Sequence, residues 1–171
     1  MDSDDLSQRQ AEDRVQVARL LGREPRGRFD VVVRAAGGAP VVIRNAPLME
    51  DGTPMPTRYW LVDRALHDAV SRLESTGGVR LAEAEIDPGE LARAHARYAA
   101  ERDEAIDERH EGPRPRGGVG GTRRGVKCLH AHLAWYLAGG DDPVGRWTAI
   151  QLGLDGPRPR SAGGSAQGAE P

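Results

Sequence analysis

The first part of the chain has the apolar spacing of an amphipathic helix. Four apolar residues there recur every three or four positions: Ala11, Val15, Ala18 and Leu21. Since that spacing places them on one helix face, the pattern predicts a helix over 8–21 with one buried stripe. Ser7 can cap its start, with Gln10 completing a capping box, and Gly22 suits its end.

Two short runs rich in β-branched residues follow, at 29–33 and 41–44. The glycines at 37 and 38 lie between them and suit a tight turn, so the two runs predict a β-hairpin. Prolines at 47, 54 and 56 and the Asp51-Gly52 pair then predict turns and extended backbone. Residues 57–62 can form a third strand.

Helical patterns fill most of the remaining chain. Asp63 can cap a helix that ends at Gly77-Gly78 and turns Leu66, Val70 and Leu73 inward. The segment 79–86 predicts a brief strand or turn.

A second helix start follows at 87–90, where an aspartate cap, a proline at the first position and a glutamate occur together. It predicts a long charged helix over 90–110 that buries Leu91, Tyr98 and Ile106. A loop rich in Gly, Pro and Arg, 112–121, separates it from a last expected helix over 123–138.

These elements predict an α+β fold: one helix-dominated domain with a small antiparallel sheet and disordered termini. The expected boundaries are a disordered N-terminus over 1–6, the domain over 7–153, and a disordered tail over 154–171 that is rich in Gly, Pro and Ser. At 171 residues, with 38% hydrophobic and 29% charged residues, the chain can form one modest core.

The charge and the cysteine content make some classes of partner and cellular compartment unlikely for this protein. The net charge of −2 and the pI near 6.2 make nucleic acid an unlikely partner. One cysteine excludes an intrachain disulfide framework and fits a reducing compartment. The acidic N-terminus is no secretory signal, and no apolar run reaches membrane-spanning length. We therefore expect a cytoplasmic protein without a membrane partner.

Arginine dominates the cations, because Lys127 is the only lysine among 24 Lys and Arg residues. A GC-rich coding sequence explains this bias simply, since Ala, Gly and Pro are also abundant. Arginine nevertheless offers planar, bidentate donors that suit carboxylate and phosphate groups.

The loop at 117–127 is the strongest candidate for an anion site. Its glycines can point backbone N–H groups at a ligand, next to a predicted helix N-terminus and several cations. The spacing is not that of a P-loop. We therefore predict that a small phosphorylated or otherwise anionic ligand binds here, with hydrolysis as one chemistry such a site could carry. The predicted ligand-binding residues are Arg26, Arg58, Gly118, Gly120, Gly121, Arg123, Arg124, Lys127 and His130.

Cys128 and His132 form a second candidate site. On a helix they lie about 40° apart, so they could share a divalent metal ion or form a thiolate–imidazole pair for catalysis. His130 points about 160° away from Cys128 on that helix. The alternative is that Cys128 is a small buried hydrophobe and His130 a hydrogen-bonded core histidine. Asp141-Asp142 can likewise cap or turn the chain, or hold a magnesium ion.

Four dispersed motifs resemble a known family. They are PRG at 25–27, DGTPMPTRYWL at 51–61, VKCLHAH at 126–132 and DPVG at 142–145. Together they are similar to the DUF501 proteins, a bacterial and mainly actinobacterial domain of unknown function, over roughly Leu20 to Trp147. Many members carry cysteines where this chain has Ala35 and Ala36, and Cys or His in place of Asp63. The resemblance therefore implies that most ligands of any family zinc site are absent here.

The resemblance also supplies a second functional hypothesis. Family members are often encoded near a septum-formation protein and an exopolyphosphatase-type enzyme. This implies, by association, a non-enzymatic adaptor linked to cell division or polyphosphate metabolism, with a protein partner. RNA binding through arginines and aromatic residues is a third hypothesis, and the near-neutral charge disfavours it.

Overall fold

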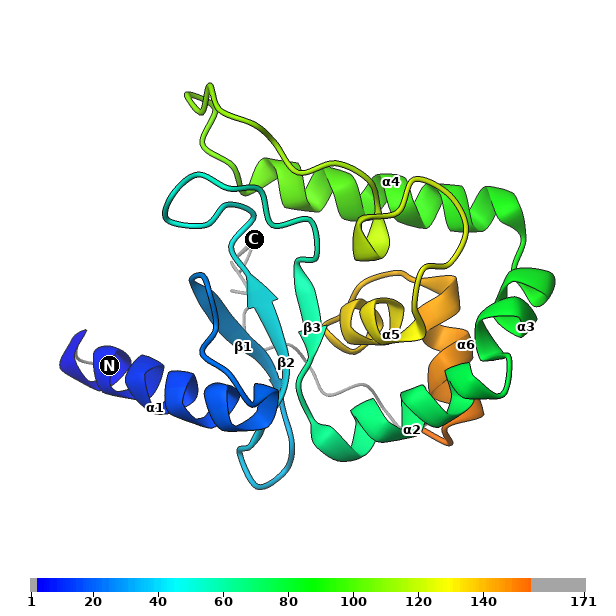
Figure 1. The fold of residues 1–171 in the computed structure, drawn as a ribbon, viewed down its shortest axis with the longest axis horizontal. Helices are drawn as coiled ribbons and strands as arrows, with labels where there is room; N and C mark the ends of the chain where they lie inside the picture. Colours follow the sequence, from blue (N-terminus) through cyan, green and yellow to red (C-terminus); the bar gives the residue numbers. More distant parts are fainter. Residues whose placement is uncertain (1–2, 155–171) are drawn as a thin grey trace, which may run out of the picture.

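A computed structural model describes residues 3–154 and shows three strands beside a group of helices (Figure 1). The strands are β1 (Phe29–Arg34), β2 (Pro40–Asn45) and β3 (Tyr59–Leu61), and they form one antiparallel sheet in the order β1-β2-β3. Gly38, at a φ of +84°, makes the turn of the predicted hairpin. The hairpin prediction is confirmed, and the third strand is shorter than the 57–62 expected.

Six α-helices and one short 3-10 helix complete the described chain. They are α1 (Ser3–Leu21), α2 (Arg64–Ser75), α3 (Gly78–Glu85), α4 (Pro88–Glu104), the 3-10 helix η1 (Val119–Gly121), α5 (Leu129–Leu137) and α6 (Pro143–Gln151). Helix α5 packs on β3 and is surrounded by α2, α6 and η1, while the end of α1 packs on the opposite face of the sheet (Figure 1). The predicted helix-dominated α+β fold is confirmed.

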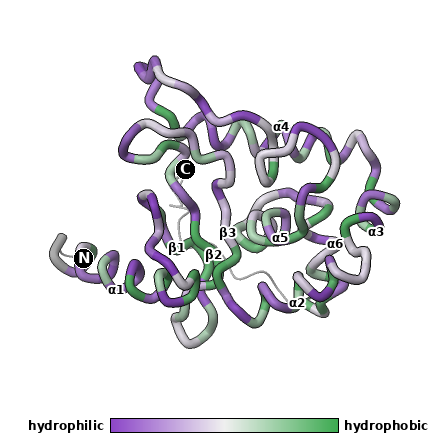
Figure 2. Tube along the Cα trace, in the orientation of Figure 1, coloured by the Kyte–Doolittle hydropathy of each residue, from purple (hydrophilic) through white to green (hydrophobic). Residues whose placement is uncertain are grey.

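The hydrophobic core centres on α5 and β2, which Figure 2 shows among the hydrophobic parts of the trace. Its fully buried members include Val42, Val70, Leu129, Leu133 and Val144. Burial of each such aliphatic side chain contributes about 1.5–3 kcal/mol. None of the helices described over 3–154 is both long and apolar enough to cross a membrane.

Helix α1 differs from the sequence prediction in its start and in its buried face. It begins at Ser3, five residues before the predicted helix start at residue 8. Val15, expected in the buried stripe, is 52% exposed, whereas Val17 is fully buried. The reason is that only the last turns of α1 reach the sheet, where Val17 packs with Ile43 and Val62. Within the predicted tail over 154–171, residues 155–171 lie outside the described residues.

The other corrections lie in the second half of the chain. Residues 78–85 form helix α3 rather than a strand or turn, because Gly77 at φ +92° redirects the chain and Ala82 then packs in the core. Helix α4 ends at Glu104, six residues before the predicted end. Helix α5 starts at Leu129 rather than residue 123, because residues 122–128 form a loop that packs on α3 and α4.

Helix α6 has no counterpart in the sequence prediction. Asp142 caps it by accepting hydrogen bonds from the N–H groups of Val144 and Gly145, and Pro143 occupies its first turn. The capping interpretation of Asp142 is therefore confirmed, with a helix behind the cap. The carboxylate of Asp141 pairs with Arg97 at 3.0 Å, so both aspartates of the proposed magnesium site have protein partners.

Candidate functional site

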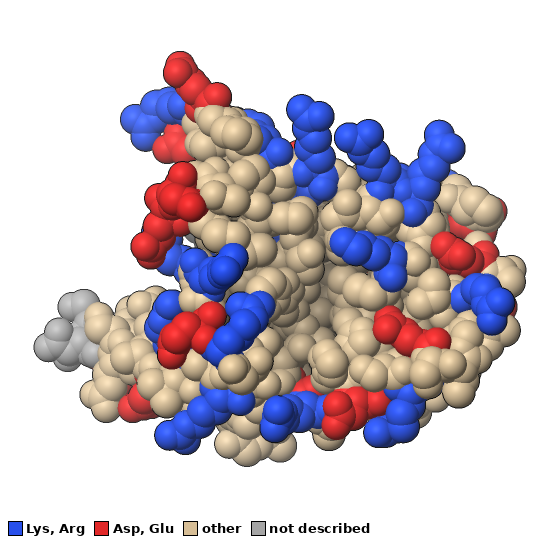
Figure 3. All heavy atoms as spheres, in the orientation of Figure 1, with Lys and Arg blue, Asp and Glu red and all other residues tan. Residues whose placement is uncertain are grey.

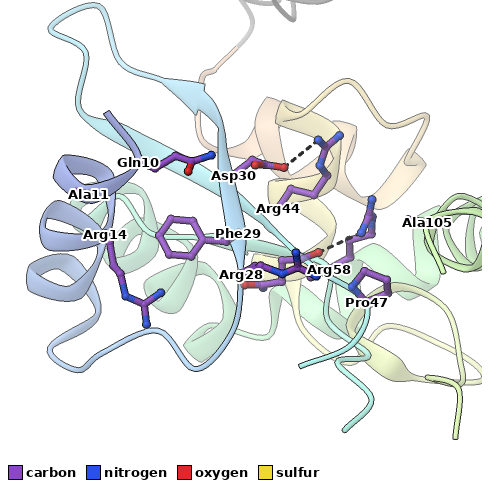
Figure 4. Close-up of a pocket in the computed structure, with 12 residues that line it drawn as sticks. Gln10, Ala11, Arg14, Arg28, Phe29, Asp30, Arg44, Pro47, Arg58 and Ala105 are labelled. Atoms are coloured by element: carbon purple, nitrogen blue, oxygen red, sulfur yellow. Dashed lines mark hydrogen bonds and ion pairs between the residues drawn. The ribbon is translucent and has the colours of Figure 1, made fainter. Parts of the chain in front are cut away.

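An open cleft of about 560 Å³ lies between helix α1 and the sheet (Figure 4). Its walls come from α1, from β1 and the residue before it, from β2 and the segment after it, and from the residues just before β3 and just after α4. Four of the lining side chains are arginines and one is acidic, so the lining itself carries a net positive charge, although Arg14, Arg44 and Arg58 each pair with a carboxylate. The lining residues are Gln10, Ala11, Arg14, Arg28, Phe29, Asp30, Arg44, Asn45, Ala46, Pro47, Arg58 and Ala105.

Arg58 is the most buried of these arginines, with 8% of the residue exposed. Its backbone N–H donates to the Tyr98 hydroxyl at 2.6 Å, and its Nη1 donates to the Asn45 carbonyl at 3.0 Å. The first bond fixes the backbone of Arg58, and the second holds its guanidinium at the cleft. The Arg58 Nε has no hydrogen-bond partner within the described chain, and the nearest carboxylate oxygen, on Glu101, is 3.6 Å away.

Glu101 is already engaged by other donors. One of its oxygens accepts a short hydrogen bond from the Tyr59 hydroxyl, and the other accepts from the Trp135 Nε1 at 3.0 Å. Burial, together with this carboxylate, raises the pKa of Tyr59, so its hydroxyl remains a donor to Glu101 at neutral pH. Glu101 therefore neutralises Arg58 only in part.

The three remaining arginines surround the outer part of the cleft. Arg44 pairs with Asp30 at 3.1 Å, because the antiparallel register places these two residues opposite each other. Arg14 donates to the Pro25 carbonyl at 2.8 Å from the side of α1. Arg28 is exposed, and its guanidinium makes no hydrogen bond or ion pair within residues 3–154. Arg28 and Arg58 thus have donor groups free for a ligand.

Of the ligand-binding residues predicted from sequence, only Arg58 lines this cleft. Arg26 is exposed outside it, and Arg123, Arg124 and Lys127 are exposed on the loop before α5. Arg26 and Arg123 therefore do not line this cleft with Arg58. The cleft residues that sequence reasoning missed, Arg14 and Arg44, carry no motif, and only the hairpin register and the docking of α1 bring them to Arg58.

The glycine-rich loop uses many of its N–H groups internally. The Gly118 N–H donates to the Thr122 carbonyl at 2.7 Å, and the Gly121 N–H donates to the Gly118 carbonyl at 2.9 Å. Arg102, which is 2% exposed, holds the Gly117 carbonyl at 2.6 Å. The loop is therefore a fixed structural connection, which leaves few of these donors for an anion. Gly120, at φ +66°, allows its tight bend.

His95 joins this loop to helix α4. Its Nδ1 accepts a hydrogen bond from the Val119 N–H at 3.1 Å, so the proton is on Nε2, which donates to the Gly125 carbonyl at 3.0 Å. A Cβ at Gly118 would overlap the His95 ring, which explains glycine there. Both ring nitrogens thus have fixed partners.

Stability should fall at mildly acidic pH because of His95. Burial, with help from the nearby His132, lowers its pKa below 6.5, while the Gly125 carbonyl and Asp142 oppose that shift. The unfolded chain therefore binds a proton near pH 6.5 that the native ring does not, so stability is lost as pH drops below about 6.5. Urea unfolding at pH 7.5 and 5.5 measures this. In His95→Gln the loss over that interval should be smaller; an equal loss would assign it to other groups.

His132 is the deeply buried histidine of the VKCLHAH motif. It is fully buried, and its Nδ1 donates to Asp142 Oδ2 at 2.7 Å, which ties α5 to α6. Its Nε2 is buried without a hydrogen-bond partner in the described chain. His132 therefore has the fully buried position that the sequence suggested for His130, whose ring is half-buried and hydrogen-bonded to the His67 carbonyl. The Cys128 thiol is hydrogen-bonded to neither ring nitrogen of His132, so the predicted catalytic pair is not formed in this structure.

Cys128 lies instead beside His130 and Glu74. One donor atom from each residue falls within 4.8 Å of the others, and all three residues are half-buried. His130 Nδ1 is 3.3 Å from Glu74 Oε1, and that oxygen also accepts the Leu129 N–H at 2.6 Å. Burial raises the pKa of the Cys128 thiol, which disfavours a free reactive thiolate.

Comparison with models of protein families shows which family this chain belongs to. The model of a family described as "Protein of unknown function (DUF501)" matches residues 31–149, most of the chain. The chain belongs to the DUF501 family. Searches of curated proteins and of solved structures found no match.

The candidate sites differ in how much of each lies within the matched residues 31–149. The Glu74, Cys128 and His130 cluster and the His132–Asp142 pair both lie within the DUF501 region. The cleft is only partly inside it. Arg44 and Arg58 belong to the DUF501 region, whereas Arg14 and Arg28 precede it.

Proposed function

We propose that this protein binds a small anionic ligand, phosphorylated or carboxylated, in the arginine-lined cleft. The observation that carries the proposal is Arg58, a buried guanidinium at the cleft wall whose Nε has no hydrogen-bond partner in the described chain. The Arg58 guanidinium donates one hydrogen bond, to the Asn45 carbonyl, and its ion pair with Glu101 is long at 3.6 Å, so an anion in the cleft would supply a further acceptor.

The arginine side chains support an anion of more than one charge. Arg28 and Arg44 stand near Arg58 around the cleft, and Asp30 is the only acidic residue in its lining. Guanidinium groups bind carboxylates and phosphates through paired hydrogen bonds, which fixes the orientation of the ligand.

The size and walls of the cleft favour a small organic anion. A volume of about 560 Å³ is typical of sites for metabolites. Phe29 and Pro47 add apolar surface next to the arginines (Figure 4). The best-fitting ligand class is therefore a compound with one charged group for the arginines and a carbon skeleton for these walls.

A thermal-shift screen tests the proposal with phosphate, pyrophosphate, citrate, sugar phosphates and nucleotides as probes. A probe present at 100 times its dissociation constant should add about 2.7 kcal/mol of stability. We expect at least one probe to stabilise the chain and Arg28→Ala to remove most of that shift. Because the Arg28 side chain is exposed and makes no hydrogen bond or ion pair among the described residues, and its backbone carbonyl still accepts the Ala46 N–H in the variant, Arg28→Ala should fold normally.

Two further variants serve as comparisons. Arg146→Ala removes an exposed arginine on α6, away from the cleft, and should leave the shift unchanged. Arg123→Ala combined with Arg124→Ala tests the glycine-rich loop predicted from sequence. A shift lost only in that double variant would move the site to the loop, and no shift with any probe would refute anion binding of this class.

Hydrolysis and an adaptor role in cell division or polyphosphate metabolism stay predictions. Basic and acidic side chains are interspersed over the face shown in Figure 3. The charge on this face therefore does not favour either an acidic or a basic protein partner. Capture with the full chain, followed by competition with the best anionic probe, would separate a partner-binding role from the ligand-binding role.

A further inference from the structure

We infer that Glu74, Cys128 and His130 form a binding site for one divalent transition-metal ion, with zinc as the best-fitting ion. The site lies where the end of helix α2 meets the start of helix α5. It shares no residue with the arginine cleft, so metal binding here does not depend on anion binding in the cleft.

The spacing of the donor atoms fits an ion between them. A carboxylate oxygen, a thiol sulfur and a ring nitrogen lie within 4.8 Å of one another. Zinc bonds of about 2.0 Å to nitrogen and oxygen in a tetrahedral site place those two atoms about 3.3 Å apart. His130 Nδ1 and Glu74 Oε1 are 3.3 Å apart. An ion could therefore bind these two atoms without displacing either side chain.

The hydrogen bonds of His130 leave Nδ1 as a donor atom for a metal. Its Nε2 lies 3.1 Å from the His67 carbonyl, which can only accept, so the proton of the neutral ring is on Nε2. The Ser71 hydroxyl, 3.3 Å from the same nitrogen, can accept as well. Nδ1 then directs a lone pair at a carboxylate oxygen. The same two atoms are within ion-pair distance when Nδ1 carries a proton, and a metal ion can occupy the place of that proton.

Hydrogen bonds to other groups also orient the proposed ligands. The Leu129 N–H holds Glu74 Oε1 at 2.6 Å, and the His67 carbonyl holds the far side of the His130 ring. Metal-binding histidines generally donate their second ring N–H to a carbonyl or carboxylate in this way, which fixes the ring and its tautomer. The cluster therefore has the outer contacts of a metal site as well as the ligand atoms.

The donor set selects the ion. One sulfur, one nitrogen and one oxygen suit zinc and cobalt better than magnesium or calcium, which prefer oxygen ligands alone. Three protein ligands leave a fourth position for water or for His67. The ring centre of His67 is 4.4 Å from that of His130, and its side chain is 54% exposed and so has room to turn.

Cobalt titration of the full, untagged and reduced chain tests the site. We expect one Co²⁺ per chain, with a thiolate-to-cobalt charge-transfer band in the near ultraviolet and the visible bands of tetrahedral cobalt. Stoichiometric zinc should abolish both. Cys128→Ser should remove the charge-transfer band, and Glu74→Gln and His130→Gln should each weaken cobalt binding at least tenfold.

Matched controls separate loss of the ligand from loss of the fold. The amide oxygen of Glu74→Gln can still accept from the Leu129 N–H, so this variant should keep the native circular dichroism spectrum. His110→Gln changes a histidine of the loop after α4 and should leave both spectrum and affinity unchanged. Absence of the charge-transfer band in the wild-type chain, or its persistence in Cys128→Ser, would overturn the site. So would equal cobalt affinity of Glu74→Gln, His130→Gln and the wild type.

Discussion

Replacing Asp142 by alanine should destabilise the fold by about 3–5 kcal/mol, because one buried carboxylate satisfies three donors. Its Oδ1 accepts the N–H groups of Val144 and Gly145, and its Oδ2 accepts His132 Nδ1. Asp142 is 2% exposed, so water does not replace the lost acceptor easily. Loss of a cap costs about 0.5–2 kcal/mol, and each buried donor left unpaired adds about 1–3 kcal/mol.

The neighbouring aspartate is the matched control. Asp141 pairs with Arg97 at the surface, with 84% of its side chain exposed, so Asp141→Ala should cost less than about 1 kcal/mol. Urea unfolding of both variants, monitored by circular dichroism, gives the two values. Equal destabilisation by the two substitutions would contradict the central position of Asp142 between α5 and α6.

Gly145→Ala should destabilise the fold by about 1–3 kcal/mol, although alanine is normally the better helix former. Within a helix this change alone would stabilise by about 0.8–1 kcal/mol. Gly145, however, lies where α6 crosses α5. A Cβ there would overlap the His132 carbonyl oxygen and the Tyr136 Cβ, so the two helices would have to separate.

Gly37→Ala is the control for this prediction. A Cβ at Gly37 meets nothing within 4 Å, and its φ lies outside the left-handed region, so the substitution should be neutral or slightly stabilising. Thermal unfolding by calorimetry compares the two variants. If Gly145→Ala were as stable as wild type, the close contact of α5 and α6 would be refuted.

The local parts of the fold could be predicted from the sequence. The β-hairpin, the Asp63 cap of α2 and the Asp87-Pro88 start of α4 each depend on residues that are close along the chain. The Asp51-Gly52 turn is also local, since the Asp51 carboxylate accepts the Thr53 N–H two residues on. Such interactions can be recognised from a short stretch of sequence, because both partners lie within it.

The start of α5 could not be predicted, because its determinant lies far away in the sequence. The Leu129 N–H is satisfied by Glu74, 55 residues earlier, so α5 begins there and not at Arg123. The same shift moves Cys128 off the helix and next to His130, and it turns His132 toward Asp142. Helical spacing within residues 123–138 cannot predict these contacts, because Glu74 and Asp142 both lie outside that segment.

The arginine cleft depends on tertiary structure in the same way. The strand pairing places Arg44 opposite Asp30, and the end of α1 brings Arg14 to the same opening. Sequence reasoning could name Arg58 as an anion ligand from the RYWL motif. It could not select Arg14 and Arg44 from the other arginines of the chain.

Isothermal titration of the full chain with inorganic pyrophosphate at low ionic strength shows whether the arginine cleft binds an anion. The arginine cleft predicts one saturable site whose affinity falls at least tenfold in Arg28→Ala and is unchanged in Arg146→Ala, because hydrogen bonds to charged groups contribute about 1.5–3 kcal/mol each. An affinity that is the same in wild type, Arg28→Ala and Arg146→Ala, or the absence of any saturable heat, would contradict an anion site in this cleft.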